Sequence, residues 1–262
     1  MNQTLDISWL NLGFGYLLIV IPLVILLYYQ TGLGRDFVIA VLRMTLQLIF
    51  LGIYLEFLFV LNSAWINLLW LVIMTGIAAQ TITSRAALNK RFFIFPVFLS
   101  LILTLLVIDA FFLGLVLRLE NLFEVRYLIP VSGMILGNCM RTNIVALQAF
   151  YGDIEKDRLI YRFALANGAT RHEALLPYMK RALLLSFNPA IATLAVMGLI
   201  SIPGMMTGQI LGGSTPVVAI KYQIMIVLAI YVTSILSIYL SIRFANRRVF
   251  DSFSNIRQDL AG

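Results

Sequence analysis

Apolar residues run along this chain in seven long blocks that short polar stretches separate. Each block is about 20 residues or longer, the length that an α-helix needs to cross a hydrocarbon layer of roughly 30 Å. Backbone amides in lipid must find partners within their own segment, so the blocks are expected to be helices. The predicted spans are approximately 9–29, 37–58, 63–82, 92–117, 129–150, 183–202 and 217–242.

The composition agrees with a membrane protein and excludes a soluble one. Hydrophobic residues make up 61% of the 262 residues and charged residues 12%, whereas soluble chains carry about 25% charged residues. We therefore predict an all-α membrane protein in which residues 1–262 form a single transmembrane domain surrounded by lipid. The sequence pI near 9.7 does not indicate nucleic-acid binding, because the basic residues flank the spans.

The distribution of basic residues predicts an orientation. With the N-terminus outside, two basic residues, Arg118 and Arg126, fall in outer loops and fourteen in inner segments. This bias predicts seven crossings with the C-terminus in the cytoplasm. No Lys or Arg precedes the first block, so we expect it to be a mature span and not a cleaved signal. The inner residues are Arg35, Arg85, Lys90, Arg91, Lys156, Arg158, Arg162, Arg171, Lys180, Arg181, Arg243, Arg247, Arg248 and Arg257.

Residues 151–181 form the one long polar interruption, with six basic residues, four acids and the single histidine, His172. Asp153 is expected to cap a first helix. A glycine is expected to end that helix, because glycine readily takes a positive φ. Thr170 and Glu173 then have the spacing of a capping box, which predicts a second helix.

Pro177 lacks an amide hydrogen, so that second helix is expected to be short and to stop or kink near Leu176. We interpret the whole segment as a structured cytoplasmic platform on which a soluble partner acts.

Polar side chains inside the second span are candidates for a translocation path. Arg43 and Gln47 share a helix face, and Glu56 lies near the outer end. Alternatively, Arg43 snorkels to the headgroups, and Gln47 bonds to another helix.

The fifth span is the most polar one. Asn138 and Arg141 share a face, and a charge at mid-membrane indicates an interior or interface position. A structural ion pair, for example between Arg141 and Asp109 of the fourth span, or snorkelling of Arg141 to the interface is the alternative. Gly133 and Gly137 have the spacing that allows close helix packing.

Residues 201–213 repeat part of this pattern. Gly204-Met205-x-x-Gly208-Gln209 resembles Gly133-Met134-x-x-Gly137-Asn138, and proline and clustered glycines favour a broken helix that faces a cavity. Met205, Met206 and Gln209 are therefore path candidates, with tight helix packing as the alternative. The surrounding stretch 202–216 is expected to be an outer loop or a re-entrant turn.

The sequence contains no motif for familiar catalysis. It has no P-loop, no H-E-x-x-H and no C-x-x-C, which excludes nucleotide binding through a P-loop and common zinc or redox sites. Its one cysteine, Cys139, excludes an intrachain disulfide. We expect a transport protein that is not an enzyme and binds no cofactor itself.

Three segments resemble the FetB family of ATP-binding-cassette permeases and the plant permeases linked to aluminium tolerance. They are RMTLQL at 43–48, GMILGN at 133–138 and SIPGMMTGQILGG at 201–213. The resemblance implies a permease that pairs with a separate ATPase, which carries the ATP and Mg. It implies an assembly of two permeases with two ATPases, iron export, and a place in the bacterial inner membrane.

The resemblance also implies residues that couple the permease to the ATPase. Residues 164–170 are similar to the alanine-then-glycine coupling motif, but they lack the initial glutamate and the later leucine-proline of importers. The implied coupling residues are Ala164, Ala166, Gly168, Thr170, His172 and Glu173.

Two other functional classes remain open from the residues alone. A secondary transporter or channel would work without an ATPase. A membrane scaffold or receptor would use 151–181 to bind a signalling protein. The path candidates mix hard and soft donors, which selects no metal.

Overall fold

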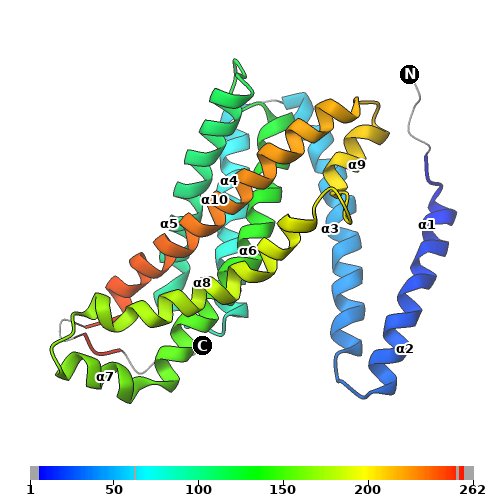
Figure 1. The fold of residues 1–262 in the computed structure, drawn as a ribbon. Helices are drawn as coiled ribbons and strands as arrows, with labels where there is room; N and C mark the ends of the chain where they lie inside the picture. The colour runs from blue at the N-terminus through cyan, green and yellow to red at the C-terminus, as the bar shows by residue number, and fades with distance from the viewer. Residues whose placement is uncertain (1–5, 62, 252–253, 257–262) are drawn as a thin grey trace.

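The computed structural model describes residues 6–61, 63–251 and 254–256, and nearly all of them are helical (Figure 1). Arg257, which was assigned to the inner side, lies outside the described residues. The elements in chain order are α1 (Trp9–Gly15), a 3-10 turn η1 (Tyr16–Ile19), α2 (Val20–Tyr28), α3 (Gly34–Leu61), α4 (Ala64–Arg85), α5 (Lys90–Asp109), a π-helical turn η2 (Ala110–Val116), α6 (Val125–Lys156), α7 (Arg158–Ala166), α8 (Arg171–Val196), α9 (Gly204–Leu211) and α10 (Pro216–Val249).

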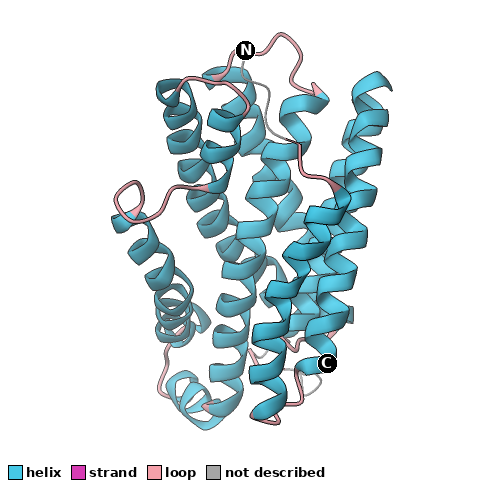
Figure 2. Ribbon diagram, turned by 90° about the vertical axis from the view of Figure 1, so that its right-hand side faces the viewer, coloured by secondary structure: helices cyan, strands magenta, loops and turns pink. Residues whose placement is uncertain are grey.

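The helices form two unequal parts. A bundle contains α4, α5, α6, α8 and α10; in it α10 packs on α5 and α6, α4 packs on the same two helices, and α8 packs on α6. The N-terminal hairpin, formed by α1, η1, α2 and α3, stands at one side of the bundle (Figures 1 and 2). Within the hairpin's described residues only Gly34 and Leu58 are buried.

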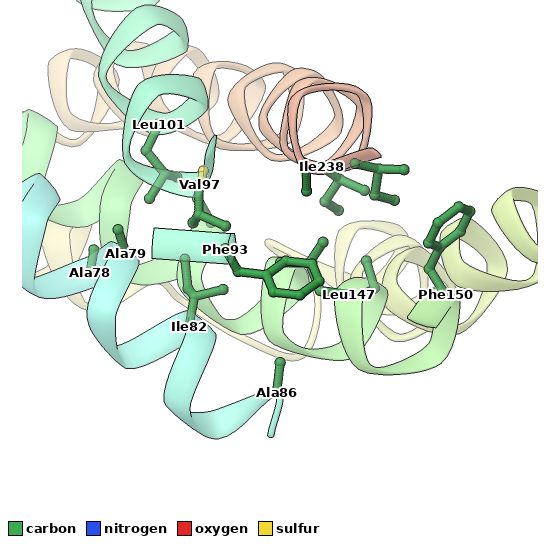
Figure 3. Packing of buried hydrophobic residues seen from close by; sticks show 14 of the residues in the cluster. Ala78, Ala79, Ile82, Ala86, Phe93, Val97, Leu101, Leu147, Phe150 and Ile238 are labelled. Carbon is green, nitrogen blue, oxygen red and sulfur yellow. The ribbon is translucent and has the colours of Figure 1, made fainter. Parts of the chain in front are cut away.

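The core of the bundle is built on helical spacing. On α5, Phe93, Val97, Leu101 and Leu105 recur every four residues and are fully buried. Figure 3 shows Phe93 extending from α5 into the space between α4 and α6. Its ring packs edge-to-face on Tyr151 with 4.7 Å between the ring centroids, an arrangement that aromatic quadrupoles favour.

Small polar residues join the bundle helices to one another. Asn143 of α6 donates to the Ser237 hydroxyl of α10 at 2.8 Å, and Cys139 lies 3.4 Å from the Ser234 hydroxyl. Ser100 of α5 is hydrogen-bonded to Ser241. In lipid, helices associate through close packing and such bonds, because leucine gains nothing by leaving one hydrocarbon for another.

Among the described residues, five helical segments are long and apolar enough to cross a membrane: Trp9–Tyr28, Gly34–Leu61, Ala64–Arg85, Lys90–Val116 and Pro216–Val249. The all-helical prediction is confirmed. α6 and α8 have sufficient length, but their polar and charged residues lower their mean hydropathy. Seven crossings with the N-terminus outside stay a prediction.

The predicted start of the first helix in 151–181 is wrong. α6 continues without interruption to Lys156, so Asp153 lies inside a helix and caps nothing. Its carboxylate instead meets the Arg181 Nε of α8 at 3.0 Å. Burial of Tyr151 and Ile154 in the core extends α6 beyond the predicted span.

Of the two outcomes predicted from Pro177, a short helix that stops near Leu176 is not observed. α8 passes through Pro177 and continues to Val196. A proline removes one backbone hydrogen bond and crowds the preceding turn. The helix persists because Ala174, Tyr178 and Ala182 on both sides of the proline are buried where α8 packs on α6.

Candidate functional site

The turn between α7 and α8 has the geometry that the sequence predicts. Gly168 has a φ of +91°, a region that glycine reaches without steric cost. The Thr170 hydroxyl accepts from the Glu173 amide at 3.3 Å, and the Glu173 carboxylate accepts from the Thr170 amide at 2.8 Å. The capping box is therefore confirmed. Hydrogen bonds from Thr170 lower the pKa of Glu173, because they favour the ionised carboxylate.

The short helix α7 is strongly amphipathic, and it is held by one face. Tyr161 is buried, donates to the Ser254 carbonyl at 2.9 Å and packs near Phe250. The burial raises the pKa of Tyr161. On the opposite face the large apolar side chains are exposed, Leu159 by 82% and Phe163 by 71%. The hairpin of α7 and the start of α8 thus presents an apolar surface to its surroundings.

The remaining predicted coupling residues lie on this same hairpin. Ala164 is partly buried and lines a small pocket together with Glu173, whereas Ala166 and His172 are exposed. Their role in ATPase docking stays a prediction.

A cavity of about 510 Å³ lies between α6, α8 and α10, beside the connection from α8 to α9. We refer to it as the central cavity. It brings together Asn138, Arg141 and Met205, three of the residues predicted from sequence to line a path. The two similar glycine-methionine segments meet here, because Met134 and Asn138 line the cavity from one and Gly204 and Met205 from the other.

The break near residue 200 forms part of the cavity wall. α8 ends at Val196 and α9 begins at Gly204, as the proline and glycines indicated. Gly198 takes a φ of +86°, and its amide donates to the Ser201 carbonyl at 2.9 Å. The chain between the two helices places Met197 and Pro203 against the cavity.

Arg141 is the one charged side chain among the described residues that line the central cavity. Within the described chain no acidic group forms an ion pair with it. Asp109 accepts a hydrogen bond from Ser132 at 2.6 Å instead, so the pairing of Arg141 with Asp109 is not present. Arg141 is exposed, so its charge can be satisfied by water, by a polar ligand or by snorkelling to the headgroups.

The other path candidates lie elsewhere. Met206 and Gln209 are partly buried on α9, and the Gln209 Oε1 is buried without a hydrogen-bond partner among the described residues. Arg43, Gln47 and Glu56 are exposed on α3. Gln47 lines a separate, mainly apolar groove between α3, α4 and α6.

The cavity also contains residues that the sequence analysis did not select. Tyr231 of α10 donates to the Ala190 carbonyl of α8, and Gln223, Ser186 and Thr142 also line the wall. On α10 the polar residues Gln223, Tyr231 and Ser234 recur at helical spacing, and this pattern could have revealed the α10 residues of the wall.

The donor atoms at the cavity are thioethers, amides and hydroxyls. Within the described chain no group of three or more His, Cys, Asp or Glu side chains is arranged to hold a metal ion.

These features define an all-helical, multi-pass membrane protein with a polar cavity between its helices. The chain belongs to the family described as Uncharacterised protein family (UPF0014), whose model matches residues 9–250.

Relatives in plants and bacteria match most of the chain. Protein ALUMINUM SENSITIVE 3 of Arabidopsis thaliana is 39% identical over 85% of this chain and 82% of its own length. The UPF0014 membrane protein STAR2 of rice is 35% identical over 80% and 74%. The probable iron export permease protein FetB of Escherichia coli is 27% identical over 92% of each chain. No solved structure matches.

Proposed function

We propose that this chain is the permease subunit of an ATP-binding-cassette exporter. It moves iron or another metal ion out of the cytoplasm, and a separate ATPase subunit that holds ATP and Mg powers it. Two permeases and two ATPases form the assembly in the bacterial inner membrane. The name of the Escherichia coli relative, a probable iron export permease, supports the cargo.

One observation carries this proposal: α8 is a continuous rod from the α7–α8 hairpin to the central cavity. It begins beside the capping box at Arg171 and contributes Ser186, Pro189 and Thr193 to the cavity wall. At roughly 1.5 Å per residue, the distance from Arg171 to Thr193 along the helix is about 33 Å. We therefore expect a displacement of the hairpin to move the cavity wall.

Further contacts connect the hairpin to the bundle. Arg181 of α8 contacts Asp153 of α6 at 3.0 Å, and α6 carries Asn138 and Arg141 to the cavity. The Tyr161 hydroxyl of α7 donates a hydrogen bond to the carbonyl of Ser254, beyond the end of α10. Force on α7 is thus transmitted to both other helices of the cavity.

The apolar face of α7 is the surface that we assign to the ATPase. In this role Leu159 and Phe163 fill a cleft on the partner, and Gly168 with Ala166 and His172 stands beside it. Burial of two large apolar side chains contributes roughly 1.5–3 kcal/mol each, which is enough to decide whether the subunits stay together during purification.

The test is co-purification of the ATPase with the double variant Leu159→Ser/Phe163→Ser. We expect at least a tenfold loss of bound ATPase and loss of ATP-dependent iron efflux, with normal membrane insertion. Leu33→Ser is the matched control, because Leu33 is also an exposed apolar residue, 54% exposed, in the turn between α2 and α3.

Normal ATPase recovery with the double variant would refute the docking surface. Transport of iron into liposomes by the purified chain alone would favour a secondary transporter or channel in its place.

A further inference from the structure

A second cavity, of about 540 Å³, lies at the end of the bundle that carries α7, where the start of α8 meets the end of α10. We refer to it as the basic pocket. Its polar lining consists of Arg171 and His172 from α8 and Arg243, Asn246 and Arg247 from α10. No acidic side chain occurs among the described residues of its lining.

Charges at this end of the bundle are separated onto two sides of α8. The acids Asp153, Asp157 and Glu173 line the small pocket between α7 and α8. Arg181 is the one basic residue among the described residues of that lining, and it contacts Asp153 at 3.0 Å. Arg171 and His172 line the basic pocket together with Arg243 and Arg247, which lie one helical turn apart on α10. The lining of the basic pocket therefore has a net positive charge, which favours an anion.

The walls of the pocket change from basic to apolar along both helices. On α8, Arg171 and His172 are followed by an apolar stretch that reaches Met179, and on α10 Tyr239 precedes Arg243 by one turn. The change extends over about 12 Å on each helix. The two helices run in opposite directions, so both gradients point the same way, with the charges at the end of the bundle. The other apolar lining residues are Phe150, Leu175, Leu176 and Ile242.

The apolar part of the wall is open. Leu176 is 56% exposed and Tyr239 50% exposed, and α10 is a candidate membrane span. An inorganic anion would use only the charges, whereas an amphiphile with a phosphate head would also cover these side chains. Basic pockets between transmembrane helices are known to bind acidic lipid headgroups.

We infer that the basic pocket binds an anionic phospholipid. Its phosphate lies among Arg171, Arg243 and Arg247, and the first part of an acyl chain covers Leu176 and Tyr239. The site is separate from the central cavity, and it does not depend on transport.

The experiment measures binding of short-chain phosphatidylglycerol and of phosphatidylcholine with the same chains to the purified full chain in neutral detergent. We expect phosphatidylglycerol to bind at least tenfold tighter. The double variant Arg243→Gln/Arg247→Gln should weaken its binding roughly 25-fold, about fivefold for each charge removed. Arg91→Gln/Arg162→Gln is the matched control, because it removes two exposed charges that do not line the pocket.

Further arms distinguish the lipid from other occupants. Leu176→Trp, which retains every charge, should weaken phosphatidylglycerol binding and leave binding of inorganic phosphate unchanged. Displacement of the lipid by equimolar inorganic phosphate would overturn the assignment to a lipid. So would equal losses in the test and control double variants.

The mass of the protein–detergent complex tests whether a second copy of the chain occupies the basic pocket. A change from dimer to monomer in Arg243→Gln/Arg247→Gln, with unchanged lipid binding, would identify the pocket as a contact between copies and overturn the proposal. The thermal stability of every variant is measured as well, so that a folding defect is recognised separately from a loss of binding.

Discussion

The N-terminal hairpin and the helical bundle differ in how much of each is buried, and mean hydropathy does not predict the difference. The hairpin's two spans have mean hydropathies of 2.5 and 2.1, yet none of either window is buried. The span in α4 has a mean hydropathy of 1.6, and 39% of its window is buried. The bundle spans Lys90–Val116 and Pro216–Val249 have mean hydropathies of 2.6 and 2.2, as high as those of the hairpin, yet 39% and 44% of their windows are buried. Mean hydropathy therefore does not distinguish the spans that form the core from those that do not.

The comparison teaches that hydropathy in a membrane protein reports contact with lipid and not packing. The hydrocarbon around the hairpin is as apolar as leucine, so burial against another helix gains little. The bundle is held by shape and by polar contacts, such as the bond from Asn143 to Ser237 at 2.8 Å. The helices α6, α8 and α10 contribute residues both to the core and to the central cavity.

The largest expected effect comes from removing a core ring. Phe93→Ala should destabilise the chain by about 3 kcal/mol or more, because Phe93 is fully buried against Tyr151 and its loss leaves a cavity. Phe50→Ala, at a position 73% exposed on α3, should change stability little. Denaturation in detergent, followed by tryptophan fluorescence, measures both; equal losses would erase the distinction between hairpin and bundle.

A smaller effect is expected from a polar contact. Asn143→Ala removes the bond to Ser237 and should cost about 1 kcal/mol, the typical magnitude for interhelical bonds in membranes. Gln47→Ala is the control, because Gln47 is exposed on α3. The same denaturation assay applies. A cost for Gln47→Ala as large as that for Asn143→Ala would show that the hairpin has a polar contact of its own.

The smallest effect is local and depends on pH. The pKa of Glu173 is lowered in the folded chain, chiefly by the Thr170 hydroxyl. The capping contribution is therefore fully present above the ordinary pKa of a glutamate, and it is lost as the pH falls through the lowered pKa. Amide hydrogen exchange of 171–176, compared at each pH with Thr170→Ala, should show extra protection at neutral pH that disappears in acid. Protection independent of pH would contradict the role of the carboxylate.

Turns and helix ends that depend on neighbouring residues agree with the prediction from sequence, and helix ends that depend on packing do not. The capping box at Thr170 and the glycine turn at Gly168 are confirmed, because both depend on a few neighbouring residues. The predicted helix start at Asp153 and the predicted stop near Leu176 are wrong, because contacts between α6 and α8 keep both helices continuous through these positions. Asn138, Arg141 and Met205 were selected and lie around one cavity, whereas Tyr231 was missed because it joins α8 only in space.

The sequence by itself determined that the chain is an all-helical membrane protein with a structured polar hairpin, since composition, apolar length and capping act within single segments. The tertiary structure decided which helices share a core and that α8 connects the α7–α8 hairpin to the central cavity. It also decided that Arg171 and Arg247 line the same pocket. Those features depend on the relative placement of helices, which weak packing forces and single hydrogen bonds determine in lipid, and no periodicity along the chain encodes them.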